Sequence, residues 1–322
     1  MKMNLRLLSL WPVLFFSLAV GVSVPANSEG PDDAPLRLAF ITCCKDAVFF
    51  DPVKKGMRDA AEKMGVECAW MGIEGVDMAA QAALVSQAIE EEYDGIALNL
   101  VDPEAFDAVV QEAMTRGVPV VGFNTDDHDT PNARLSGVSQ RLYAAGRTLA
   151  KFVAPKIPAR AHVLMTMHDE GVSSLEDRLR GLQDELKAKN IKVTVCISGN
   201  DIREGVDIIK RQLENHPDIQ IVLCTGQADT EAAGRAIDAH FAEKGHWAAG
   251  FDLSPTTLRL INKGAIRATV DQQPYVQGFY PVIQLTHYIR YGIMPSDIDS
   301  GATIITRENA DQVLELTRQG YR

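Results

Sequence analysis

From residue 36 onward, short apolar runs alternate with longer segments whose apolar residues recur at helical spacing. The run LRLAFIT, for example, precedes a segment in which Val53, Met57 and Ala60 fall on one helical face. Parallel strands need a crossover connection, which is usually a helix. The alternation therefore predicts βαβ units and parallel sheets that helices cover on both faces. The fold class that follows is α/β.

About ten such strands can be counted, which is more than one open sheet in a chain of this length comfortably uses. Two doubly wound lobes, each with its own parallel sheet, better fit 322 residues with 46% hydrophobic content. The rhythm of strands and helices breaks at 137–146, so we place the division between the lobes there. No linker-like segment occurs, which indicates that short, close-set strands join the lobes.

The predicted helices share recognisable ends. Asp51-Pro52, Asp102-Pro103 and Ser254-Pro255 each place a hydrogen-bond acceptor before a proline, the order expected at an N-cap and the first helical residue. Cation–glycine and cation–asparagine pairs, such as Arg116-Gly117 and Lys189-Asn190, are typical of helix stops.

The first 26 residues predict a cleavable signal peptide. They combine a basic start (Lys2, Arg6) with an apolar run and end in Val24-Pro25-Ala26, and they lack a cysteine for a lipid anchor. The mature protein is therefore expected in the periplasm. The net charge of −11 argues against nucleic acid and anionic lipid as partners.

The five cysteines favour neither a disulfide framework nor a zinc site, because their number is odd and no CxxC spacing occurs. Four of them lie in apolar, strand-like runs, where a free cysteine behaves as a small hydrophobic residue. A bridge between the adjacent Cys43 and Cys44 would be strained, and it stays the less favoured alternative. The five are Cys43, Cys44, Cys68, Cys196 and Cys224.

Two stretches, PVVGFNTDD at 119–127 and HWAAGFDLS at 246–254, end an apolar run on Gly-Phe and then a polar side chain. Ligands of open parallel sheets bind outside the carboxyl ends of the strands. If the lobes face each other, Asn124 and Asp252 converge on one cleft. The competing interpretation is that each only caps a helix or forms an Asx-turn. Phe123 and Phe251 are expected in the cores.

From about 36 to 306 the sequence resembles the type I periplasmic sugar-binding proteins of ABC importers, the family of the ribose-binding proteins. The motifs that carry the resemblance are FFDPVKKGMRDAAEKMG, RGVPVVGFNTDD, SSLEDRLRGLQDEL, DTEAAGRAI, AAGFDLSP and ATVDQQPYVQG. Their order, following a signal peptide, makes the match specific although each motif alone is weak.

The resemblance implies two Rossmann-like lobes joined by a hinge of three strands, with crossings near 138–140, 271–273 and 301–303. The expected N-terminal lobe is 36–138 plus 273–301. The expected C-terminal lobe is 139–272 plus 302–322.

The resemblance also implies a set of ligand-binding residues. Phe49 and Phe50 form an aromatic wall, Asn124 and Asp252 end corresponding strands, and Gln272 lies at the second crossing. Aromatic rings accept the C–H faces of a sugar, while carboxylates and amides satisfy its hydroxyls.

Other positions depart from the ribose-binding pattern. Cys43 stands where those proteins have a serine, and Asn124-Thr125 replaces their Asp-Arg pair, so Cys43 and Thr125 are included as ligand-binding candidates. Ala47 replaces an asparagine. Glu176 takes the place of an arginine, which predicts an acceptor-rich pocket. A polyol, cyclitol or deoxy-sugar then fits at least as well as ribose.

These expectations describe a solute-binding protein, not an enzyme, that captures a small sugar or polyol in an interlobe cleft. It closes around the ligand as a monomer and delivers it to an ABC membrane permease. The main alternative is a periplasmic sensor for a small polar or cationic ligand, acting through a chemoreceptor or sensor kinase. Carboxylates near Phe49 and Phe50 would suit an amine through cation–π contact. The export signal argues strongly against a transcription repressor.

The remaining motifs are weaker. DDHD at 126–129 lacks the spacing of a calcium loop and is expected to be solvated. HDEG at 168–171 follows a strand and is expected to line or border the cleft. GxSxG, GxGxxG and phosphate-binding glycine loops are missing, and neither a metal nor a cofactor is expected.

Overall fold

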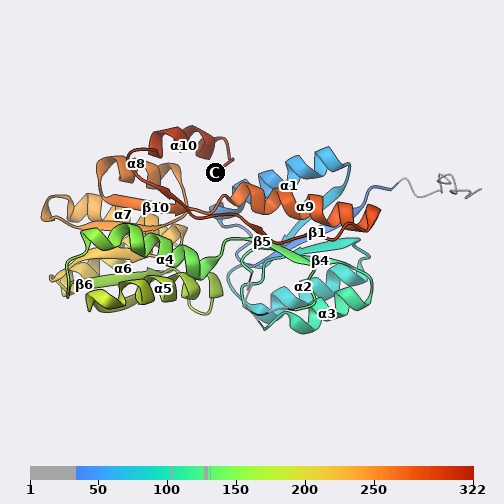
Figure 1. Cartoon of the computed structure of the whole chain (residues 1–322), viewed down its shortest axis with the longest axis horizontal. Helices are drawn as coiled ribbons and strands as arrows, with labels where there is room; N and C mark the ends of the chain where they lie inside the picture. The colour runs from blue at the N-terminus through green and yellow to red at the C-terminus, as the bar shows by residue number, and fades with distance from the viewer. Residues whose placement is uncertain (1–33, 103, 127–129, 131) are drawn as a thin grey trace, which may run out of the picture. The chain divides into compact units, whose positions relative to one another are not determined.

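The computed structural model describes residues 34–102, 104–126, 130 and 132–322 (Figure 1). The predicted signal peptide, residues 1–26, lies outside the described residues. In the described part, no helix has both the length and the apolar character needed to cross a bilayer.

The first sheet is entirely parallel, with the strand order β11-β5-β4-β3-β1-β2. Its strands are β1 (Arg37–Thr42), β2 (Glu67–Gly72), β3 (Gly95–Leu98), β4 (Val120–Asn124), β5 (Ser136–Ser139) and β11 (Ile298–Asp299). Helices α1 (Asp51–Met64) and α9 (Pro274–Tyr291) cover one face, and α2 (Met78–Glu90) and α3 (Asp107–Thr115) cover the other. A 3₁₀ turn, η1 (Val48–Phe50), leads into α1.

The second sheet has the corresponding order β12-β10-β9-β8-β6-β7. Its strands are β6 (His162–Met167), β7 (Lys192–Ile197), β8 (Ile219–Cys224), β9 (Trp247–Phe251), β10 (Ile266–Asp271) and β12 (Thr303–Ile305). Its helices are α4 (Leu142–Val153), α5 (Ser173–Leu186), α6 (Ile202–Asn215), α7 (Gln227–His240), α8 (Pro255–Lys263) and α10 (Ala310–Arg318). Three 3₁₀ turns follow helices, at η2 (Ala154–Lys156), η3 (Lys187–Lys189) and η4 (Ala242–Lys244).

One strand corrects the expectation of purely parallel sheets. β12 pairs with β10 in the antiparallel direction, so the second sheet is mixed. The chain reaches β12 directly from β11, through the short segment after Asp299, and therefore enters the sheet without a helical crossover. An antiparallel edge on an otherwise parallel sheet is common in doubly wound folds.

The helix starts were predicted with mixed success. Ser254 is the N-cap of α8, and its Oγ accepts a hydrogen bond from the Thr257 amide at 2.9 Å. Asp51 is the first residue of α1 rather than its cap, because Phe50 occupies the cap position. Asp102 caps a turn through the amides of Glu104 and Ala105, but α3 begins only at Asp107.

Each sheet buries the phenylalanine of its Gly-Phe stretch completely. Phe123 packs against Phe40 and Trp70 in the first sheet, and Phe251 lies in the core of the second. The core positions expected for Phe123 and Phe251 are confirmed. Each buried phenylalanine therefore fixes the backbone position of the polar residue that follows it.

The chain passes between the two sheets three times, after β5, after β10 and between β11 and β12. Side-chain amides connect these passages. Gln140 donates a hydrogen bond from Nε2 to the Gly301 carbonyl at 2.8 Å, and Gln273 Nε2 donates to the Ser300 carbonyl at 2.8 Å. The sheet memberships are compatible with the lobe boundaries expected from the sequence, which stay a prediction.

Candidate functional site

A cavity of about 550 Å³ lies between the carboxyl ends of the two sheets. Loops after β1, β2, β3 and β4 contribute one side, and loops after β6, β7, β8, β9 and β10 contribute the other. The Ser173 amide donates a hydrogen bond to the Val101 carbonyl at 3.0 Å, which joins the two sides directly at one edge. The volume falls within the range of small-molecule sites.

Asn124 and Asp252 line this same cavity. Both have left-handed backbone angles, with φ of 63° for Asn124 and 69° for Asp252, and both are more than nine-tenths buried. Asparagine and aspartate adopt this conformation more readily than other side chains. The two Gly-Phe stretches thus end in the same backbone turn, and their polar side chains converge on one cavity.

Arg178 on α5 is a charged cavity residue that sequence analysis missed. Its side chain is 3% exposed, and its guanidinium Nη1 lies 3.8 Å from Asp252 Oδ2. The guanidinium carbon also lies 4.4 Å from the centre of the Phe251 ring. Burial raises the pKa of Asp252, which the charge of Arg178 opposes. Burial likewise lowers the pKa of Arg178 against the charge of Asp252.

The structure corrects the position assigned to Glu176. Glu176 is not among the residues that line the cavity, and its Oε1 accepts a hydrogen bond from the Gly171 amide at 3.0 Å. Residues two apart on a helix point about 200° apart, so Arg178 faces the cavity when Glu176 faces away. Because Arg178 lines the cavity, the pocket is not purely acceptor-lined, contrary to what Glu176 predicted.

Two features hold Arg178 in place. Its guanidinium donates to Gln140 Oε1 through both Nε (3.1 Å) and Nη2 (2.9 Å), and through Nη1 to the Thr225 carbonyl at 2.9 Å. Helices α4 and α5 also approach closely at two glycines. A Cβ on Gly146 would lie 2.3 Å from the Arg178 carbonyl oxygen, and one on Gly181 would meet the Tyr143 carbonyl oxygen at 2.3 Å.

A chain of amide hydrogen bonds links Asn124 to Asp252 behind the cavity. Asn124 donates from Nδ2 to Gln277 Oε1 at 2.9 Å, Gln277 donates from Nε2 to Gln272 Oε1 at 3.0 Å, and Gln272 donates from Nε2 to Asp252 Oδ1 at 2.5 Å. Gln277 is fully buried on α9 and also donates to Ser300 Oγ at 2.8 Å. Because these hydrogen bonds occupy particular amide atoms, they determine which atoms of Asn124 and Gln272 remain available to a ligand.

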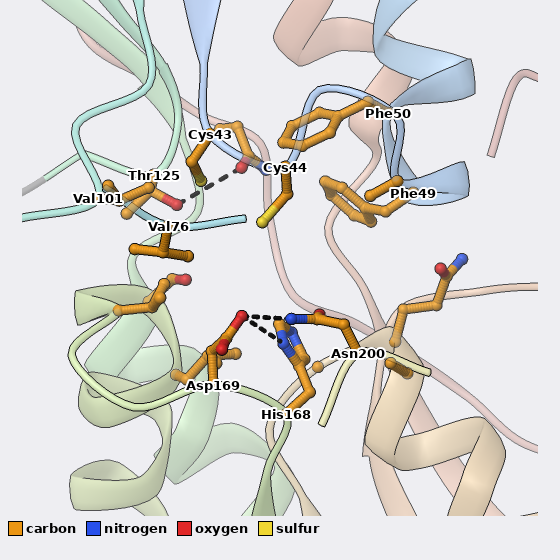
Figure 2. A pocket seen from close by; sticks show the side chains of 18 of the residues that line it. Cys43, Cys44, Phe49, Phe50, Val76, Val101, Thr125, His168, Asp169 and Asn200 are labelled. Atoms are coloured by element: carbon orange, nitrogen blue, oxygen red, sulfur yellow. Dashed lines mark hydrogen bonds and ion pairs between the residues drawn. The ribbon is translucent and has the colours of Figure 1, made fainter. Parts of the chain in front are cut away.

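The aromatic wall has the expected place. Phe49 and Phe50 line the cavity with their ring centres 5.2 Å apart in an edge-to-face arrangement. Figure 2 shows the two rings on one side of the cavity and His168, Asp169 and Asn200 on the other. Phe50 is buried against Trp70, with 5.4 Å between ring centres, while Phe49 is the more exposed of the two.

Cys43, Thr125 and Gln272, the remaining candidates from the sequence, also line the cavity. Cys43 and Cys44 follow β1, and Thr125 follows Asn124. The structure thus brings together seven of the eight predicted residues and leaves Glu176 outside. Whether each contacts a ligand stays a prediction.

His168 and Asp169 border the cavity, as expected for HDEG. Burial lowers the pKa of His168, but the carboxylate of Asp169, whose Oδ2 lies 3.8 Å from His168 Nδ1, and the charges of Asp229 and Asp252 outweigh this effect and raise the pKa overall. The nearby His168 lowers the pKa of Asp169, which accepts a hydrogen bond from Asn200. Charge on this side of the cavity is therefore shared among several groups.

The first residue of the acidic segment DDHD differs from the solvated loop that was predicted. Asp126 is buried and its carboxylate lies 2.7 Å from Arg134 Nε. Residues 127–129 lie outside the described part. Within that part, no cluster of histidine, cysteine, aspartate and glutamate could hold a metal ion.

Residues 38–292 match the family model described as periplasmic binding protein domain, and the chain belongs to this family. Its fold is that of the type I periplasmic binding proteins, as the resemblance implied, and the family comprises substrate-binding proteins rather than enzymes.

Among the relatives, the chain is similar to the xylose/arabinose-binding protein XylF of Sulfolobus acidocaldarius, with 28% identity over 89% of this chain and 75% of that protein. It is also 28% identical to the ribose import binding protein RbsB of Bacillus subtilis, over 79% of this chain and 81% of that protein. A carbohydrate transporter from Acidothermus cellulolyticus, solved in complex with myo-inositol, superposes with a TM-score of 0.79. That match has 26% identity and covers 90% of this chain and 100% of that chain.

Proposed function

We propose that the chain binds a small sugar, of the size and hydroxyl content of a pentose, in the cavity between its two sheets. The observation that carries the proposal is the buried pair of Arg178 and Asp252 in a cavity that Phe49 also lines. A sugar hydroxyl both donates and accepts hydrogen bonds, so a guanidinium and a carboxylate side by side satisfy neighbouring hydroxyls. The aromatic ring suits the C–H face of the sugar.

The presence of Arg178 changes the ligand class that the sequence favoured. An acceptor-rich pocket favoured polyols, cyclitols and deoxy-sugars over ribose, whereas the pocket with Arg178 offers donors and acceptors. Aldopentoses therefore fit at least as well. The sugars for which the relatives are named, xylose, arabinose and ribose, support this class. The myo-inositol bound in the similar solved structure supports a cyclitol as well. A buried arginine in the cavity disfavours a cationic amine.

Ligand capture closes the two lobes, which we place at 36–138 plus 273–301 and at 139–272 plus 302–322. A ligand shifts the population toward a closed form only by contacts that require both lobes. Asn124 and Phe49 come from the first lobe, and Asp252 and Arg178 from the second. A ligand held by all four groups satisfies that condition.

Residues 1–26 serve as a signal peptide that directs the protein out of the cytoplasm. There the protein, as a monomer, delivers its sugar to an ABC permease. Membership of the periplasmic binding protein family supports this role. Nothing in the cavity favours the alternative of a sensor that acts through a chemoreceptor or sensor kinase.

The test is isothermal titration calorimetry of the purified protein with D-xylose, L-arabinose, D-ribose and myo-inositol, with putrescine as the amine control. We expect at least one sugar to bind with a Kd of about 1 μM, which corresponds to a binding free energy of roughly −8 kcal/mol. Putrescine should give no heat of binding. Binding of putrescine alone, or no binding and no rise in melting temperature with any sugar, would refute the proposal.

A further inference from the structure

Two adjacent thiols form part of the cavity wall. Cys43 and Cys44 directly follow β1, both line the cavity, and all five cysteines are free. Cys43 is 5% exposed, and Cys44 is half-buried. Figure 2 shows the Cys44 sulfur directed into the cavity, below the ring of Phe50 and beside that of Phe49.

These two thiols differ chemically from the other three. The proximity of the two thiols raises the pKa of Cys43, with burial adding to the rise, and lowers the pKa of Cys44 against the effect of burial. Burial raises the pKa of Cys68 to about 12 and also raises those of Cys196 and Cys224. The thiolate is the reactive form of cysteine, so reactivity concentrates at Cys44, with a second thiol beside it.

The backbone around Cys44 couples this pair to the aromatic wall. Cys44 has a left-handed φ of 47°, and its carbonyl accepts a hydrogen bond from the Ala47 amide at 2.8 Å, directly before η1. The next carbonyl, that of Lys45, accepts a hydrogen bond from Trp70 Nε1 at 3.2 Å. Any rearrangement at Cys44 therefore reaches Phe49 and Trp70 within a few residues.

We propose that Cys43 and Cys44 are a redox modification site that closes reversibly to a vicinal disulfide and thereby weakens ligand binding in the cavity. The oxidant is a disulfide, as supplied by thiol–disulfide exchange in an oxidising compartment. The Cys44 thiolate attacks one sulfur of the oxidant and releases a thiolate. The Cys43 thiolate then attacks the Cys44 sulfur of the mixed disulfide and releases the second thiolate of the oxidant. Two electrons pass to the oxidant, and the two thiol protons end on the two released thiols.

Geometry makes this bond labile. The peptide between the two cysteines is trans, which fixes the Cα atoms about 3.8 Å apart, whereas protein disulfides usually span at least about 4.4 Å. A strained disulfide has a more oxidising potential and is readily reduced. The bond therefore suits a reversible switch. The effect on ligand binding rests on the proposed function, whereas bond formation does not.

The first test uses the full chain and mass spectrometry. Trypsin releases residues 38–45, LAFITCCK, which contain both thiols and none of the other cysteines. After incubation with oxidised glutathione we expect this peptide to lose the mass of two hydrogens, and dithiothreitol to restore it. In Cys43→Ser protein the peptide should instead carry a glutathione adduct at Cys44. A wild-type peptide that keeps both hydrogens, or carries stable glutathione, would overturn the proposal.

The second test reports on the cavity wall without any ligand. In a Trp247→Phe background, Trp70 is the one tryptophan among the described residues, and its hydrogen bond to Lys45 makes its emission sensitive to ring closure. We expect a reversible emission change on oxidation that is abolished in Cys44→Ser. Disulfide formation with unchanged emission would overturn the coupling to the wall.

The last measurement is the Kd for whichever probe, D-xylose, L-arabinose, D-ribose or myo-inositol, binds the reduced protein. We expect oxidation to weaken it by about tenfold or more, with Cys68→Ser behaving as wild type. Equal affinities in the two redox states would overturn the effect on binding. If no sugar binds the reduced protein, the proposed function fails, while the mass and emission results still decide the disulfide.

Discussion

Replacing Asp252 by asparagine tests the polar end of the cavity most sharply. The wild-type Oδ1 accepts from Gln272 at 2.5 Å, and Oδ2 faces Arg178 at 3.8 Å, too far for a direct hydrogen bond. Oδ2 is thus the oxygen that remains for a ligand hydroxyl. Asparagine keeps the shape and one acceptor, but it removes the negative charge.

The expected loss follows from these contacts. A hydrogen bond to a charged group contributes about 1.5–3 kcal/mol, so ligand affinity should fall by roughly 10- to 150-fold. Arg178 would also lose its nearest counter-charge while 3% exposed, so the free energy of unfolding should fall by up to about 3 kcal/mol. Asp229 lies near enough to Arg178 to influence its pKa and offsets part of that cost.

Calorimetry gives the affinity and urea denaturation gives the stability. Asp238→Asn is the matched control, because Asp238 forms an ion pair with Lys263 on the surface of the same lobe, away from the cavity. The control should bind sugar as wild type does. Unchanged affinity in Asp252→Asn would refute the assignment of Asp252 to the ligand.

Three further predictions concern groups around the cavity. Gln277→Leu leaves the Asn124 and Gln272 amides without their buried partner. Urea denaturation should therefore show a free energy of unfolding lower by about 2–3 kcal/mol, and calorimetry should show a weaker sugar affinity. Wild-type values for both quantities would show that the hydrogen bonds of Gln277 are dispensable. The pKa of His168 is raised in the folded state, so its contribution to stability is fully present at low pH and is lost as pH rises through the folded pKa. The stability advantage of wild type over His168→Gln should therefore shrink as the pH rises above 6.5, the ordinary pKa of histidine. An advantage that grows with pH would reverse the assigned direction. Gly146→Ala places a methyl group against the Arg178 backbone. The free energy of unfolding should fall by about 1–3 kcal/mol, and sugar binding should weaken. A variant as stable as wild type would mean that α4 and α5 separate freely.

The periodic elements could be predicted because each depends on local sequence. Alternating apolar runs and helical faces identified the main strands and the two-sheet architecture, and Gly-Phe before a polar residue located Asn124 and Asp252. The three-residue β12 has too few residues for a periodic signal, so its antiparallel direction did not emerge from the pattern.

Contacts between distant segments account for most of what the sequence could not show. Gln277 meets Asn124 across 153 residues, and nothing in the local pattern of α9 marks one glutamine as buried. Asp126 belongs to an acidic run that reads as solvated, yet its partner Arg134 comes from beyond the run. Glu176 and Arg178 show a different limit. They lie only two positions apart on α5, yet Arg178 faces the cavity and Glu176 faces away from it, and the sequence pattern did not show which of the two points inward.

The most direct measurement is a crystal structure of the protein with the sugar that binds most tightly. Ring density in contact with Phe49, with hydroxyls within hydrogen-bond distance of both Asn124 and the Asp252–Arg178 pair, is the predicted result. A sugar that touches groups of one lobe only, or that lies outside this cavity, would contradict the account.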